Sequence, residues 1–358
     1  MRSAAKAMHS IEKLHSAGLV RTADLAALKA VAARYAVAIT PAIAALIDPS
    51  DPNDPIARQF VPDPAELATS AAERTDPIGD DAHSPVEGIV HRYPDRVLLK
   101  LVHICPVYCR FCFRRAMVGP RGRPSLTREQ LDAALAYVRG HPEIWEVILT
   151  GGDPLILSAR KLREVLSALA GIDHVRIIRI HTRVPAAAPE RITPELVRAL
   201  KGAGRATFVV LHANHPRELT AAARSASARL IDAGIPMLSQ SVLLKGVNDD
   251  PDTLGALMRA FVEMRIKPYY LHHADLAPGT AHLRTGIAEG QALMRSLRAR
   301  LSGLCQPVYV LDVPGGAGKV PVGPSYLDLA LSAAEGEAPL YRVDDPEGRP
   351  HLYPPGEP

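Results

Sequence analysis

Three of the chain's four cysteines lie in the stretch HICPVYCRFCFRR, which spans residues 103–115. Cys105, Cys109 and Cys112 have the spacing C-x-x-x-C-x-x-C. Thiolates bind soft metals and iron–sulfur clusters, and these intervals let one loop bind three corners of a cubane. A [4Fe–4S] cluster normally takes four protein cysteines, so a set of three leaves one iron with an open coordination position. One alternative is a single zinc ion, which requires a fourth ligand such as His103, and another is a chance cluster of buried free cysteines. The spacing favours the open cluster over zinc.

The elements that position these cysteines are predicted to be alternating strands and helices. Amphipathic segments of helical length, such as TREQLDAALAYVRGH, separate most of the short apolar runs. This alternation predicts βα units around a parallel sheet, which form a partial or complete barrel with its active site at the carboxyl ends of the strands. Polar motifs follow these runs, namely TGGDP, HTR, HANH, HHAD and DVPGGAGK, and a purely structural barrel does not need them there. The predicted strands cover 97–103, 147–150, 175–181, 206–212, 236–244, 267–273 and 307–313.

The residues before the barrel form a separate N-terminal segment. Residues 21–47 carry apolar side chains at helical spacing, and Thr40-Pro41 is typical of the N-cap and first position of a second helix. Residues 48–64 contain five prolines and predict an extended connector. We therefore expect three parts, which are an N-terminal helical and extended segment over 1–95, the barrel over 96–320 and a C-terminal tail over 321–358.

Composition narrows the class of protein. Hydrophobic residues make up 47% of the chain and charged residues 22%, which is typical of an enzyme with a large core rather than of a disordered chain. The formal net charge of +4 is too small to indicate a nucleic-acid surface. The N-terminus has no apolar signal region, and no run of eighteen apolar residues follows it. We expect a cytoplasmic protein that binds neither membranes nor nucleic acids.

The cysteine stretch resembles the cluster-binding loop of radical S-adenosylmethionine (SAM) enzymes. In that superfamily the amino and carboxylate groups of SAM chelate the open iron of the [4Fe–4S] cluster. The motif TGGDP resembles the glycine-rich loop after the second strand, where a backbone without side chains lets the methionine group of SAM approach. The resemblance therefore implies that Gly151, Gly152 and Asp153 bind SAM.

A narrower resemblance, to the lysine 2,3-aminomutase family, covers most of the chain. It includes HRYPDR, NHPREL, QSVLLKGVND, KPYYLHHADLAPGTAHLRT and YVLDVPGGAGK. Such enzymes combine the cluster, SAM and pyridoxal 5′-phosphate (PLP) to move an amino group from the α to the β carbon. The resemblance implies an isomerase that converts L-lysine to β-lysine, an electron donor such as flavodoxin or ferredoxin, and a homo-oligomer.

The resemblance also assigns the PLP site. Lys319 ends the glycine-rich motif PGGAGK, and we expect a flexible loop from which this lysine binds PLP as a Schiff base. Arg92, Tyr93 and Arg96 match the residues that bind the PLP phosphate, where cations and a hydroxyl can meet its oxygens. His212 and Gln240 match positions near SAM.

The substrate residues are assigned in the same way. Arg114 matches the arginine that pairs with the substrate α-carboxylate, because a guanidinium binds a carboxylate through two hydrogen bonds. Asp275 and Asp312 match the two acids that bind the ε-ammonium of lysine. A substrate without that ammonium leaves both buried acids unpaired. Family members that act on glutamate are expected to lose this pair, so its presence favours lysine.

Two departures from the family pattern affect the choice of function. The tail has no cysteine, whereas longer family members carry C-terminal cysteines that bind zinc, so we predict no zinc there. Cys305 stands alone and is predicted to be a buried hydrophobic residue. The short ending also resembles the branch that makes (R)-β-lysine for translation elongation factor P. An aminomutase for another amino acid and a non-catalytic zinc-stabilised binding module are two further hypotheses.

Overall fold

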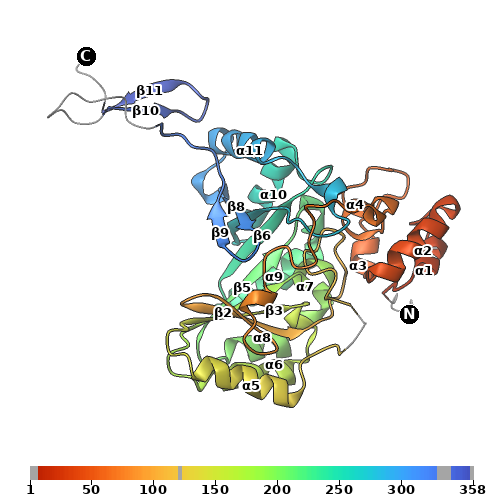
Figure 1. Ribbon diagram of the computed structural model, residues 1–358, viewed down its shortest axis with the longest axis vertical. Coiled ribbons are helices and arrows are strands. Elements are labelled where there is room, and N and C mark those ends of the chain that lie inside the picture. The colour runs from red at the N-terminus through yellow and green to blue at the C-terminus, as the bar shows by residue number, and fades with distance from the viewer. Residues whose placement is uncertain (1–6, 120–122, 329–339, 355–358) are drawn as a thin grey trace.

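The computed structural model describes residues 7–119, 123–328 and 340–354, and its centre is a nine-stranded sheet (Figure 1). The strands follow one another across the sheet in chain order, from β1 to β9. The seven predicted strands are confirmed, each end falling within two residues of its predicted position, and they pair with one another in parallel. They are β2 (Arg96–Val102), β3 (Glu146–Gly151), β4 (Ile177–Thr182), β5 (Ala206–His212), β6 (Met237–Leu243), β7 (Lys267–His273) and β8 (Val308–Val313).

The two edge strands were not predicted. β1 (Ile89–Tyr93) pairs antiparallel with β2, and β9 (Gly318–Pro321) pairs antiparallel with β8. The expectation of a flexible loop at Lys319 is therefore wrong, because this lysine lies on β9 opposite Asp312. Within the described ranges β1 and β9 do not pair with each other, so the barrel is partial. Its two edges still meet, since the backbone N–H of Lys319 donates to the Tyr93 hydroxyl at 2.6 Å.

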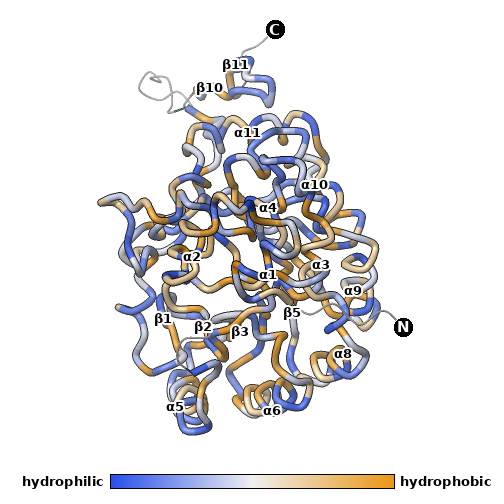
Figure 2. Tube along the Cα trace, turned by 90° about the vertical axis from the view of Figure 1, so that its right-hand side faces the viewer, coloured by the Kyte–Doolittle hydropathy of each residue, from blue (hydrophilic) through white to orange (hydrophobic). Residues whose placement is uncertain are grey.

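Helices cover the outer face of the sheet. Apolar side chains alternate with polar ones along them, and Figure 2 shows this alternation along α5, α6 and α8. Side-chain caps define their starts; for example, Thr127 and Gln130 form a capping box at α5. The covering helices are α5 (Arg128–Arg139), α6 (Ala159–Ala170), α7 (Val184–Ala187), α8 (Pro194–Lys201), α9 (Ala221–Asp232), α10 (Pro251–Glu263) and α11 (Ile287–Arg300).

The N-terminal segment packs beside the barrel (Figure 1). Thr40 caps a helix that begins at Pro41, as predicted, but this helix has only four residues. The predicted extended connector over 48–64 contains a short helical turn. A second apolar cluster, which includes Ile43 and Phe60, joins the segment to Val107 of the cysteine loop. The segment's helices are α1 (Ile11–Ser16), α2 (Leu25–Arg34), α3 (Pro41–Ala44) and α4 (Ala57–Phe60).

A two-stranded hairpin, β10 (Tyr341–Asp344) and β11 (Pro350–Tyr353), projects from the body near the C-terminus (Figure 1). Residues 329–339 and 355–358 of the predicted tail lie outside the described residues. Cys305 is buried in the main core, as predicted. Among the described helices, none is both long and apolar enough to cross a membrane.

Candidate active site

The inside of the barrel is polar. On β4, Ile178 and Ile180 belong to the core beneath the helices, so strand alternation places Arg179 and His181 inside the barrel. Barrel interiors are usually filled by branched apolar side chains, and polar groups in their place indicate a ligand site. The same alternation places further polar residues inside, and these are Lys100 on β2, Thr150 on β3, His212 on β5, Gln240 on β6, His272 on β7 and Asp312 on β8.

Lys319 contacts two of these inward residues. Its ammonium forms an ion pair with Asp312, and its Nζ lies 3.3 Å from Nδ1 of His272. Burial opposes ionisation of Asp312, but the adjacent His272 and the Lys319 ammonium outweigh it and hold the pKa of that carboxyl well below its usual range. Burial, with the Lys319 charge, also lowers the pKa of His272. A neutral imidazole and a carboxylate therefore face the lysine.

Two arginines that the sequence assigned to different ligands meet at Asp80. Arg92 donates through Nη2 to Asp80 Oδ1 at 3.0 Å. Arg114 donates to Asp80 Oδ2 from Nε at 2.9 Å and lies 2.8 Å from it through Nη2. Arg92 Nη1 also lies 3.7 Å from Asp312 Oδ1, which connects the arginines to the Lys319 ion pair. The predicted phosphate-binding and carboxylate-binding cations are thus neighbours on one side of the lysine.

Tyr93 and Arg96 lie at the edge of this group. The Tyr93 hydroxyl accepts the hydrogen bond from the Lys319 backbone, so it lies beside the predicted PLP lysine. The Arg96 guanidinium stacks over the Tyr93 ring, 3.8 Å from its centroid, and pairs with Asp95 at 2.6 Å. Its side chain is one-third exposed, at 33%. Arg96 is therefore close to the site, and its side chain is partly exposed there.

Asp275 follows β7 and interacts with Asp312. Burial and repulsion from the Asp312 carboxylate raise the pKa of Asp275 to about 7. Lys319 and Arg114 lower that pKa without cancelling the increase. The two acids predicted to share one ammonium therefore interact through space, and a bound cation would relieve their repulsion.

The three cysteines line one small cavity of about 40 Å³, together with residues such as Tyr35 and Val118. All three thiols are free. Burial raises the pKa of each, that of Cys112 to about 11. No group of three or more His, Cys, Asp or Glu side chains among the described residues converges as the ligands of a single metal ion would. The thiols that bind three corners of a cubane do not need to converge on one point.

The N-terminal segment clamps the cysteine loop. Glu66 is fully buried and forms ion pairs with Arg110 and Arg115, which flank Cys112 in the sequence. Arg110 also donates to the carbonyl of Ala36 at 2.8 Å, and the Arg115 guanidinium lies 3.6 Å from the centroid of the Tyr35 ring. Buried charges are tolerated when they are paired and hydrogen-bonded in this way.

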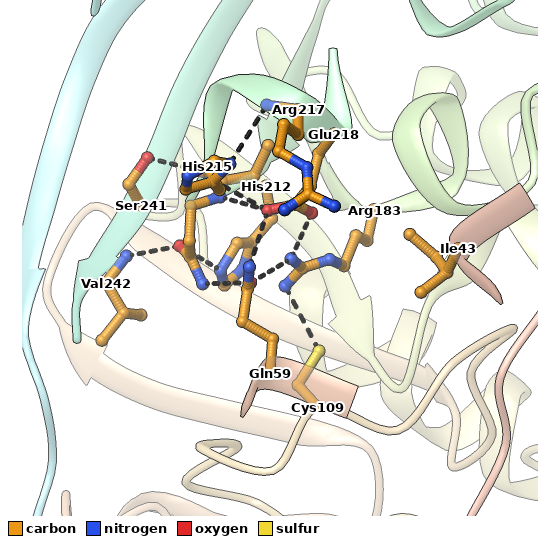
Figure 3. Close-up of polar contacts among 12 residues, drawn as sticks. Ile43, Gln59, Cys109, Arg183, His212, His215, Arg217, Glu218, Ser241 and Val242 are labelled. Atoms are coloured by element: carbon orange, nitrogen blue, oxygen red, sulfur yellow. Dashed lines mark hydrogen bonds and ion pairs between the residues drawn. The ribbon is translucent and has the colours of Figure 1, made fainter. Parts of the chain in front are cut away.

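A second buried polar network reaches Cys109 of the loop (Figure 3). Arg183, just after β4, donates through Nη1 to the Sγ of Cys109 at 3.3 Å. Its other terminal nitrogen pairs with Glu218 and donates to Gln59 Oε1 at 2.8 Å. Asn214 donates to the same Gln59 oxygen at 3.1 Å. The network joins β4, the turn before α9 and the N-terminal segment to one cysteine.

The two glycines of TGGDP allow the backbone that leads into the cysteine loop to lie close to them. A Cβ on Gly152 would overlap the backbone of Ile104, and one on Gly151, whose φ is +114°, would overlap the carbonyl of Val102. Asp153 is buried; its carboxylate accepts hydrogen bonds from the Thr182 hydroxyl and the Arg183 N–H, each at 2.7 Å. The close approach of the TGGDP loop to the cysteine loop therefore requires the two glycines. This packing role is separate from any contact of theirs with SAM.

Gly152→Ala is expected to lower both the free energy of unfolding and the iron content of the reconstituted protein. Forcing a methyl group into a packed site costs about 1–3 kcal/mol, and here the obstacle is backbone of the cysteine loop. Denaturant unfolding and iron analysis measure the two effects. Gly303→Ala is the matched control, because nothing lies within 4 Å of a Cβ there. Equal unfolding midpoints for the two variants would refute this account.

The remaining predicted SAM residues lie between the lysine and the cysteines. His212 Nε2 is 3.2 Å from Asn214 Oδ1, and its ring centroid is 5.6 Å from that of Phe111 in the cysteine loop. Gln240 is the register partner of His212 on β6. His181 is also inside the barrel, and its buried Nε2 has no hydrogen-bond partner in the described part of the chain. A polar ligand in the barrel would satisfy it.

These donor sets match the three expected cofactors. Free thiols lining one cavity beside several guanidinium groups suit an iron–sulfur cluster, whose ligands are anionic. A lysine beside two arginines and a tyrosine hydroxyl suits PLP, which has one aldehyde and one phosphate. The orphaned His181 nitrogen and the inward His212 and Gln240 suit a polar ligand between these two places.

Sequence reasoning missed several residues of the site. Asp80, His272 and Arg183 were not predicted, although His272 lies in the HHAD motif and Arg183 in the HTR motif. Alternation along β7 could have placed His272 inside the barrel. Nothing in the local sequence places Asp80 against two arginines or Arg183 against Cys109, which is 74 residues away.

Comparisons with known proteins show which families this chain is similar to. Residues 99–257 match the model of the radical SAM superfamily. The chain is 44% identical over 291 residues to the L-lysine 2,3-aminomutase of Clostridium subterminale, covering 81% of this chain and 70% of that protein. It is 36% identical over 300 residues to the glutamate 2,3-aminomutase of Clostridioides difficile, covering 84% and 70%. A solved radical SAM methyltransferase from Sphaerobacter thermophilus aligns with a TM-score of 0.45 at 19% identity, over 62% of this chain and 68% of that chain.

Proposed function

Because this chain belongs to the lysine 2,3-aminomutase family of radical SAM enzymes, we propose that it moves the α-amino group of L-lysine to the β carbon. The product is β-lysine, and the enzyme is an isomerase that uses a [4Fe–4S] cluster, SAM and PLP. The observation that supports this substrate best is the interaction of Asp275 with Asp312 beside Lys319. Two acids at that place bind an ammonium, which glutamate does not have on its side chain.

We propose the following residues for the cofactors. Cys105, Cys109 and Cys112 hold the cluster, and Lys319 holds PLP through its amine. When bound, SAM and the reduced cluster supply a radical that removes a hydrogen atom, and PLP carries the migrating nitrogen. The phosphate of PLP is bound by Arg92, Tyr93 and Arg96, and SAM lies against Gly151, Gly152, Asp153, His212 and Gln240.

The protein's own groups orient the substrate. Arg114 binds the α-carboxylate, while Asp275 and Asp312 bind the ε-ammonium, so the two ends of lysine fix its direction in the barrel. Arg114 is already held by Asp80, which limits its motion when substrate arrives. The neutral His272 stays beside the Lys319 nitrogen and can accept a proton from it when the amine is exchanged. The clamped N-terminal segment excludes water from the cysteine side.

We also propose the division into a segment over 1–95, a barrel over 96–320 and a tail over 321–358. An external one-electron donor such as flavodoxin or ferredoxin, a homo-oligomeric assembly and a cytoplasmic location complete the proposal. The family resemblance supports the donor and the assembly, and the chemistry supports the donor as well, since the cluster needs an electron from outside.

Anaerobic turnover tests the function. Protein reconstituted with iron, sulfide, PLP, SAM and dithionite is expected to convert L-lysine to β-lysine. Chiral chromatography measures the product. Cys109→Ala is expected to abolish turnover and lower the bound iron, whereas Cys305→Ala, in the core, keeps both. A protein that binds a cluster and cleaves SAM but leaves lysine unchanged would show that the substrate assignment is wrong.

A further inference from the structure

Arg183 donates a hydrogen bond to a sulfur of the cysteine loop. The proposed function gives this residue no role. Arg183 is the one side chain among the described residues that donates a hydrogen bond to a cysteine of the loop, and its acceptor is Cys109 Sγ at 3.3 Å. Figure 3 shows the guanidinium between this sulfur and the Glu218 carboxylate. The three cysteines are therefore not equivalent, because one of them lies against a positive charge.

The position of this guanidinium is fixed from several sides. Its second terminal nitrogen is held by Glu218 and by Gln59 Oε1 at 2.8 Å, while its backbone N–H is held by Asp153 at 2.7 Å. Glu218 in turn accepts the backbone N–H groups of Asn214 and His215, at 2.8 and 3.0 Å. An arginine with this many partners cannot turn away from the sulfur without breaking buried hydrogen bonds.

The apolar surroundings of Arg183 strengthen the electrostatic effect of its charge on neighbouring groups. The Arg183 guanidinium lies 4.6 Å from the centroid of the Phe60 ring and 5.6 Å from that of Phe111. Arg183 itself is only 5% exposed, and Glu218 is fully buried. A charge in such a dry place is screened far less than one at the surface, so it acts strongly on a group in direct contact.

We propose that Arg183 is a positioning residue that raises the reduction potential of the cluster through its hydrogen bond to the Cys109 thiolate. Hydrogen bonds to ligand sulfurs and the net charge around a cluster set its potential. Reduction adds one electron, taken from a low-potential donor such as dithionite, and the added negative charge is stabilised by the guanidinium. Glu218 opposes this effect while it holds the arginine in place. The inference rests on the proposed cluster site.

The test is a potentiometric titration of the reconstituted, SAM-free protein, with the reduced cluster followed by electron paramagnetic resonance. Arg183→Gln is expected to shift the midpoint to a more negative potential, so that the ratio of reduced to oxidised cluster at a fixed potential falls about tenfold, or ~59 mV. Arg183→Lys, which keeps the charge, is expected to lie between wild type and Arg183→Gln. Glu218→Gln is expected to shift the midpoint in the opposite, positive direction.

Opposite signs distinguish this effect from a general loosening of the loop, which would change iron content without reversing the shift. Arg205→Gln is the matched control, because Arg205 bonds the carbonyl of Ala170 at the amino end of β5, whereas the cysteine loop follows the carboxyl end of β2. Should Arg183→Gln retain too little cluster to titrate, Arg183→Lys and Glu218→Gln decide, and unchanged midpoints in both would overturn the inference. Failure of wild-type protein to bind any cluster would instead refute the proposed function.

Discussion

Lys319→Ala is expected to abolish β-lysine formation, with turnover at least about 10³-fold lower, since it removes the amine that binds PLP. The visible absorbance of lysine-bound PLP should disappear in the same variant. The structure adds a second effect, because the Lys319 ammonium is the cation paired with Asp312. Without it, the ion-pair partners that Asp312 keeps among the described residues are His272 and Arg92, both at 3.7 Å. Breaking a buried ion pair costs about 3–5 kcal/mol, so thermal stability should also fall.

Lys319→Arg separates these two effects. Arginine keeps a positive charge for Asp312 but does not form the imine, so this variant should recover much of the stability and none of the turnover. Lys267→Ala is the control elsewhere, because Lys267 bonds backbone carbonyls such as that of Leu304 at 2.9 Å. A Lys319→Ala protein that still binds PLP covalently would require another lysine at the site.

The seven parallel strands and the cysteine motif could be predicted because each depends on a short stretch of sequence. Apolar runs of strand length and helical segments between them determine the βα units. The two edge strands were missed for local reasons as well. β9 contains Gly318, and glycine is depleted in strands, so PGGAGK was interpreted as a loop. For β1, the turn at Pro94-Asp95 was a usable signal for a hairpin with β2.

The contacts that organise the site were beyond sequence reasoning. Asp80 meets Arg92 and Arg114 only because β1, β2 and the segment before them come together in the fold. Glu66 is 44 residues from Arg110, and nothing in the spacing of either residue indicates their ion pair. The family resemblance named the residues expected to touch ligands, whereas the residues that hold those residues in place emerged only from the fold.

The second large effect is expected from changing Asp275 or Asp312, the two acids of the proposed substrate site. Asp312→Asn is expected to lower kcat/KM for L-lysine roughly 10²- to 10³-fold, the equivalent of about 3–4 kcal/mol for removing one partner of a buried charge pair. Wild-type enzyme should discriminate against 2-aminohexanoate, which lacks the ε-ammonium, by a factor on the order of 10⁴. Discrimination should shrink in Asp312→Asn and in Asp275→Asn. Loss of activity toward both substrates in equal proportion would show that these acids do not bind the ammonium.

The same pair predicts a pH dependence with a definite sign. The raised pKa of Asp275, about 7, means that this carboxyl is protonated below that pH and ionised above it. An ammonium binds the ionised form, so lysine affinity should increase as pH rises through about 7, and binding below that pH should release a proton. Calorimetric titrations in buffers of different ionisation enthalpy count the proton.

Repulsion from Asp312 is one cause of the raised Asp275 pKa, and Lys319 is among the groups that lower it. The pH range over which lysine affinity rises is the limb of the binding curve. Asp312→Asn should therefore move this limb to lower pH, even though lysine binding itself is weaker. PLP bound to Lys319 removes that ammonium, so the limb should lie at or above about 7 in the loaded enzyme. Asp232→Asn, at an exposed pair with Arg265, should leave the limb in place. A limb that stays in Asp312→Asn would show that burial and Asp80, rather than Asp312, raise the Asp275 pKa.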